Sequence, residues 1–233
     1  MEAQELITGS HYLGLNLFGL EIRISETVVV GWILIIVIGI ILKLLTHDLK
    51  KIPTGKRQVI AEWIVTTVNS LVKETMGEKN IAFAPYIAAL FMSSIMGSLV
   101  GLFGLRPITS NYNTTIAWAL VTFVMVQFFS IRTKGLKLHL KSYINPLNII
   151  GDLALPVSMS FRHFGNVSSG FIISAILYMA LSALSGAIGL PAPLTTVGIP
   201  GFLSLYFDLF SGFMQAFVFI MLTMAFVGAA TEE

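Results

Sequence analysis

The sequence has no cysteine and few charged residues. Without cysteine, the chain can form neither a disulfide framework nor a thiolate metal site, and it has no cysteine nucleophile. Charged residues make up 11% of the 233 residues, whereas a soluble domain carries roughly a quarter. A chain with so little solvated surface is not an ordinary soluble enzyme, a disordered tail or a nucleic-acid binder.

The sequence also lacks the short motifs that would indicate catalysis on nucleotides or peptides. It contains no GxxxxGK phosphate loop and no HExxH zinc motif. We therefore expect no cofactor, no bound metal and no ATP chemistry in this chain.

What the chain has instead is long uncharged runs. Three of them lie at 27–42, 80–105 and 107–131, and each is close to the ~20 residues that a helix needs to cross a bilayer. A longer run at 163–207 is sufficient for two more crossings, because its glycines and prolines at 186–201 would break a continuous helix.

These runs predict an all-α polytopic membrane protein with a single membrane domain, five membrane-crossing helices and one interfacial amphipathic helix. The residues at 56–76 form the interfacial helix, because apolar residues recur there at helical spacing between charged ones. We expect an external N-terminal segment at 1–26, spans at 27–45, 82–104 and 114–131, and two long tilted helices at 145–187 and 200–231.

The first of the two long helices is too long for a simple crossing. From residue 145 to 186 it would measure about 60 Å, about twice the thickness of the hydrocarbon layer. Pro146 suits its first turn. Either Pro156 breaks this helix, or it runs steeply tilted and presents a long flank to something beside it.

The basic residues predict the orientation. Of the 14 lysines and arginines, all but Arg23, Arg106 and Arg162 follow the first or the third span. Basic loops stay in the cytoplasm, so we expect the N-terminus outside and the C-terminus inside. The acidic start of the chain does not fit a signal peptide, and a short N-terminus of this kind suits a bacterial plasma membrane.

Arg162 is the most informative residue, because it falls in the middle of an uncharged helix. An arginine at mid-membrane costs about 3 kcal/mol on insertion scales, so a carboxylate should face it. Asp152 is ten residues away, about 15 Å along the helix and on another side of it. A pair with Asp208 on the next helix could merely pin two helices, but a functional arginine is the better interpretation.

Polar residues accompany Arg162 in two stripes. Ser158 and Asn166 lie on the same helical face as Arg162. On the following helix Asp208 and Gln215 share a second stripe. Charged and amide groups at this depth indicate a path for an ion.

At these residues the sequence resembles a known family. The segment PVSMSFRHFGN at 156–166, followed by QAFVFIMLT at 215–223 and a terminal Glu-Glu, is similar to subunit a of the F-type ATP synthase membrane sector. Three upstream segments also resemble family landmarks and occur in the family's order. They are GKRQ at 55–58, LFGLRP at 102–107 and TKG at 133–135.

The resemblance implies the stator half of a rotary ion motor. Its two long helices would hold Arg162, as essential counter-charge and gate, against a ring of c subunits that each carry one carboxylate. The chain would conduct protons or sodium ions through two offset half-channels. Its further partners would be the b-subunit peripheral stalk and the rest of the ATP synthase complex, on which the ATP chemistry occurs.

The resemblance also suggests roles for single residues. Asp152 would line the inner half-channel and Asp208 the outer one, with Asn166 and Gln215 as polar neighbours of the arginine. Many family members carry a glutamate or histidine where this chain has Phe171. His163 either replaces that relay or is a packing residue.

Two other classes of protein share part of this pattern. An intramembrane aspartyl protease would use two aspartates, but residues 149–152, IIGD, lack the first glycine of a GxGD motif. The alternative that stays open is a self-contained membrane ion channel or secondary transporter, although no inverted repeat is visible.

Overall fold

The structure, a computed structural model, describes residues 12–17, 20–51, 55–103, 105–189 and 205–232. Within these residues, five helical stretches are long and apolar enough to cross a membrane. The prediction of an all-α polytopic membrane fold is therefore confirmed. The five stretches are Glu26–Leu45, Glu78–Phe103, Tyr112–Lys134, Pro146–Ile188 and Leu209–Thr231.

The expected external segment contains a β-hairpin that the sequence did not lead us to expect. Strand β1 (Tyr12–Leu17) pairs antiparallel with β2 (Leu20–Ser25) and leads directly into the first long helix. Apolar and polar residues alternate along β2, the period of a half-exposed strand.

The helices up to the third span follow the uncharged runs. The second span is helical throughout, but it tightens into 3₁₀ turns at both ends, where the i→i+4 ladder gives way to shorter bonds. In chain order the elements are α2 (Glu26–Leu45), α3 (Lys56–Met76), η1 (Glu78–Phe83), α4 (Ala84–Leu99), η2 (Val100–Phe103), η3 (Ile108–Ser110), α5 (Tyr112–Lys134) and α6 (Leu136–Ser142).

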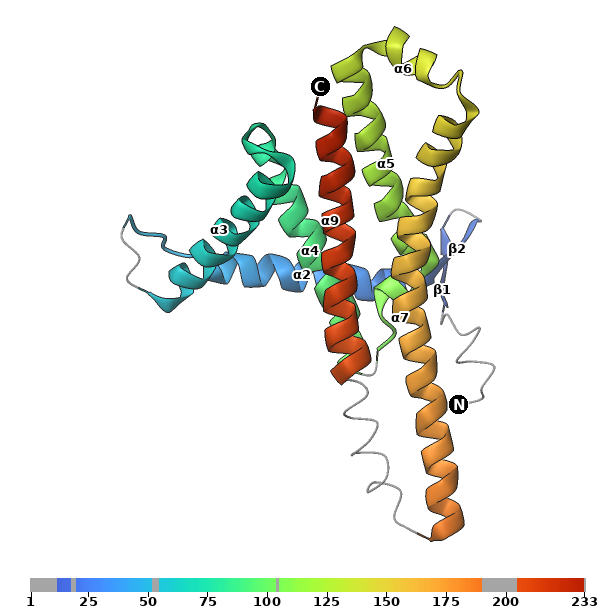
Figure 1. The fold of residues 1–233 in the computed structure, drawn as a ribbon. Coiled ribbons are helices and arrows are strands. Elements are labelled where there is room, and N and C mark those ends of the chain that lie inside the picture. The colour runs from blue at the N-terminus through green and yellow to red at the C-terminus, as the bar shows by residue number, and fades with distance from the viewer. Residues whose placement is uncertain (1–11, 18–19, 52–54, 104, 190–204, 233) are drawn as a thin grey trace.

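Helix α7 (Pro146–Ile188) is continuous through Pro156. Its 43 residues span about 65 Å at 1.5 Å per residue, so Pro156 does not break the helix. Asn145 caps its start by accepting a hydrogen bond from the Leu147 N–H, and Gly189 ends it at φ 72°. In Figure 1 α7 and α9 lie side by side and α2 runs across them, so a spanning α2 leaves both steeply tilted.

The last helix begins with a wider turn than expected. A π-helical stretch, η4 (Leu205–Ser211), leads into α9 (Gly212–Thr231). The first residues of the helix predicted at 200–231 lie outside the described residues. Such π turns are rare in proteins, and those that occur are often found at functional sites.

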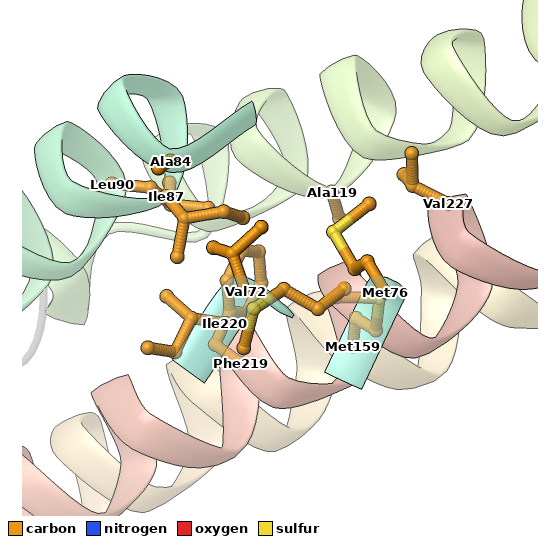
Figure 2. Packing of buried hydrophobic residues seen from close by; sticks show 11 residues of the cluster. Val72, Met76, Ala84, Ile87, Leu90, Ala119, Met159, Phe219, Ile220 and Val227 are labelled. Carbon is orange, nitrogen blue, oxygen red and sulfur yellow. The ribbon is translucent and has the colours of Figure 1, made fainter. Parts of the chain in front are cut away.

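Helix α9 forms the centre of the bundle, and α7 lies on its flank. Half of the most apolar stretch of α9 is buried, against 6% of that of α7. Figure 2 shows Phe219, Ile220 and Val227 of α9 packed among apolar residues from α3, α4, α5 and α7. The buried side of α7 packs against α5 and α9, and its other side is left open.

Helix α3 divides its apolar residues between the core and the surface. Val72 and Met76 near its end are 0% and 2% exposed and pack against α9 (Figure 2). Trp63 in its first half is 67% exposed. The helix therefore joins the bundle at one end and exposes apolar side chains at the other.

Candidate functional site

Arg162 lies near the middle of α7, on the side that no other described helix covers. Its side chain is exposed, and so are Ser158 and Asn166 on the same face. Large apolar side chains surround this polar stripe along the whole length of the helix. The exposed ones are Ile149, Ile150, Leu153, Val157, Phe161, Ile172, Ile173, Ile176, Met179, Leu184 and Ile188.

Arg162 has no carboxylate partner among the side chains that the structure describes. The ion pairs among those side chains join His47 to Asp48 and Lys73 to Glu78, both at the surface. Asp208 lies in the π-helical turn η4, but its side chain is outside the described part of the chain. An arginine keeps its proton in a protein, so a positive charge lies on the open face of α7.

Beside Arg162, side chains of α7, η4 and α9 form a polar network. Asn166 Nδ2 donates to Gln215 Oε1 at 3.4 Å, and Ser211 Oγ donates to Asn166 Oδ1 at 3.1 Å. Gln215 is 6% exposed, so the network extends from the core to the open face of α7. The structure thus brings together two of the predicted site residues, 49 positions apart.

His163 points into the bundle, whereas Arg162 next to it is exposed. Its ring is fully buried and lies 5.3 Å from the Phe219 ring and 6.0 Å from that of Trp118, centroid to centroid. Nε2 is 3.3 Å from Ser94 Oγ, while Nδ1 has no hydrogen-bond partner. The geometry favours the packing interpretation, because the ring joins α7 to α4, α5 and α9 and does not reach the open face.

Asp152 lies ten residues before Arg162, at the end of a polar cleft of about 670 Å³ between α5, α6 and α7. Its Oδ2 accepts hydrogen bonds from Tyr143 OH at 2.8 Å and from Gln127 Nε2 at 3.0 Å. The cleft is lined further by Lys134, His139, Lys141 and Asn148.

A second polar cavity, of about 200 Å³, lies where α2, η3 and α5 begin. Phe164 of α7, two residues after Arg162, lines it together with Glu26 and Arg106. Asn111 donates from Nδ2 to Thr27 Oγ1 at 2.9 Å at its wall. The sequence reasoning missed this cavity, because its residues come from three separate turns.

The fold and the site define a helical membrane protein that holds isolated charged and amide groups on steeply tilted helices, an arrangement typical of proteins that move ions. The family described as ATP synthase A chain matches residues 28–228. The chain belongs to this family, the ATP synthase a subunits.

Curated relatives match over nearly the whole chain. ATP synthase subunit a of Geobacter sulfurreducens is 30% identical over 220 residues, which cover 90% of this chain and 89% of the relative. The subunit a of Moorella thermoacetica is 31% identical over 94% of this chain and 96% of its own. That of Propionigenium modestum, named as sodium ion specific, is 30% identical over 88% of this chain and 73% of its own.

Membership of the family establishes the general function of the chain. The chain is a multi-pass membrane protein, an ion-translocating subunit of the ATP synthase complex without catalytic chemistry of its own. Its bacterial relatives support a place in the bacterial plasma membrane.

Proposed function

We propose that this chain is the stator half of a rotary ion motor and that Arg162 faces the carboxylates of a c-subunit ring. The observation that carries the proposal is the exposed Arg162 in the middle of an uncovered apolar flank. Such a flank could face lipid, but the arginine in it could not do so without a cost of about 3 kcal/mol or more. A partner protein with an apolar surface and one carboxylate would cover the apolar flank and also neutralise the arginine.

Arg162 acts as counter-charge and gate in this arrangement. An ionised rotor carboxylate is stabilised beside the guanidinium but cannot enter lipid, so it must bind a proton or a sodium ion before it turns outward. The fixed positive charge also repels cations that would leak directly between the two access paths. Ion flow is thereby coupled to rotation.

The two aspartates serve opposite access paths. Asp152 lines the polar cleft beside the basic helix α6, which supports its role in the inner half-channel. Asp208, in the π-helical turn η4 before α9, lines the outer half-channel. Ser158, Asn166 and Gln215 provide polar contacts for the ion between them, and His163 supports Arg162 by holding α7 in the bundle, in place of a relay.

The orientation follows from the charges. The lysines and arginines of α3, of the C-terminal end of α5 and of α6 face the cytoplasm, with the N-terminus outside and the C-terminus inside. Helix α3 lies in the cytoplasmic interface. The b-subunit peripheral stalk and the rest of the ATP synthase hold this chain stationary against the ring.

Cross-linking tests the stator role directly. The chain has no native cysteine, so single cysteines can be placed at Ser158 and Ser169, both exposed on the open side of α7. We expect each to cross-link to a small proteolipid that carries a matching cysteine. Ile35→Cys is the control, because Ile35 is 67% exposed on the separate helix α2. Equal cross-linking at all three positions, or none on α7, would refute the assignment.

The side assignment of the aspartates has its own test. With ion uptake driven from outside, we expect Asp208→Asn to slow ATP synthesis more than Asp152→Asn does, because only the outer acid collects ions there. With ATP-driven uptake from the cytoplasm, the order should reverse. The measurement is the initial rate in vesicles of both orientations, and identical effects in both directions would contradict the two-sided path.

A further inference from the structure

Three polar side chains from three different elements converge at Asp152, which lines the cleft between α5, α6 and α7. Gln127 lies on α5, Tyr143 in the turn between α6 and α7, and Asp152 on the second turn of α7. Tyr143 OH also lies 2.8 Å from Gln127 Oε1, so each of the three contacts the other two. We call this group the inner triad.

The two donors hold only one oxygen of the carboxylate. Gln127 Nε2 and Tyr143 OH both approach Oδ2 of Asp152. No hydrogen bond to Oδ1 is found in the described part of the chain. These contacts hold the carboxylate in one orientation, and its second oxygen is still free to accept a proton.

Tyr143 remains a donor over the physiological range. Burial raises the pKa of its phenol above the ordinary 10.0, and the hydrogen bond to Asp152 and the negative charge of Asp152 raise it further. The other titratable groups that line the cleft are Lys134 of α5 and His139 and Lys141 of α6. His139 contacts the Tyr143 ring edge to face, at 5.0 Å between centroids, and its Nδ1 lies 3.1 Å from Ser130 Oγ.

We propose that the inner triad is the proton-exchange site at the cytoplasmic end of the ion path, in which Gln127 and Tyr143 position Asp152. Oδ1 accepts a proton from a hydronium ion in the cleft, which leaves a water molecule, and later returns the proton to water on the way toward Arg162. Gln127 N–H and Tyr143 O–H both lie at Oδ2, where they stabilise the carboxylate and leave Oδ1 open to the proton. This inference rests on the proposed inner role of Asp152.

A double-mutant cycle in the complete ATP synthase tests the positioning role. In inverted vesicles, the initial rate of ATP-driven proton pumping reports uptake from the cytoplasmic side. We expect Tyr143→Phe and Gln127→Leu each to reduce this rate about threefold to tenfold, the effect of one lost hydrogen bond of ordinary strength. In an Asp152→Asn background the same changes should cause no further loss, because both act through that carboxylate.

Tyr178→Phe is the matched control, because it also removes a single phenol oxygen. Tyr178 lies on α7, as Asp152 does, but outside the cleft, so this change should leave the pumping rate unchanged. Equal losses from Tyr143→Phe with and without Asp152→Asn would overturn the proposal, because they indicate a merely structural role. So would a wild-type rate in Tyr143→Phe. This variant lacks a single oxygen atom and decides the question if Gln127→Leu fails to assemble.

The cycle also separates this inference from the proposed function. If Asp152→Asn pumps normally while Arg162→Ala does not pump at all, the inner triad is refuted and the stator role stands. If Arg162→Ala also pumps normally, the stator role itself is refuted.

Discussion

Arg162→Ala abolishes ATP synthesis driven by an imposed ion gradient. Without the guanidinium, no fixed charge stabilises an ionised rotor carboxylate inside the membrane, so the ring cannot release its ion between the two access paths. The expected result is complete loss of coupled synthesis, with the subunit still present in the membrane, because Arg162 is exposed and holds no described contact in the core. ATP formation in vesicles and an immunoblot of the assembled complex measure the two quantities.

Arg132→Ala is the control for this experiment. Arg132 is exposed in the last turn of α5, on the basic side of the molecule, and its loss removes the same charge outside the ion path. We expect near-normal synthesis from it. Synthesis by Arg162→Ala at the level of this control would contradict the gate.

Gly212→Val strongly reduces the amount of folded subunit. A Cβ atom on Gly212 would lie 2.8 Å from Cβ and 3.4 Å from Oγ of Ser98, so the first turn of α9 contacts α4 too closely for any side chain. Separating the two helices opens the core around α9, and overpacking of this kind costs about 1–3 kcal/mol or more. The abundance of the subunit in membranes and the Tm of the purified complex report the loss.

Gly39→Val is the matched change for comparison. Nothing lies within 4 Å of a Cβ built on Gly39 in α2, and both substitutions place the same β-branched residue in a helix. Equal abundance of the two variants would mean that the α4 to α9 contact does not stabilise the fold.

The helical fold could be predicted because a bilayer leaves few options. Backbone groups in lipid must be bonded within their own segment, so each long uncharged run had to be a helix. The ends of α7 are marked in the sequence by Pro146 and Gly189. The β-hairpin was missed because two short alternating segments outside the membrane carry a weak signal.

The site could be predicted only in part. Arg162 is visible because a charge within a long apolar segment is costly in a membrane and indicates a function. The direction of His163 depends on which side of α7 meets α9, and periodicity alone does not settle that. Gln127 and Tyr143 were missed because they approach Asp152 through tertiary packing, 25 and 9 positions away along the chain. The one available signal was an amide, Gln127, inside the uncharged run 107–131.

The central claim is that this chain moves ions only together with a rotor. The most direct measurement is ion flux into sealed vesicles under an imposed potential, with the chain reconstituted alone and with its c-subunit ring and stalk. We expect flux from the assembled membrane sector and none from the chain alone. Flux through the isolated chain at a comparable rate would refute the dependence on a rotor and would identify a self-contained channel or transporter.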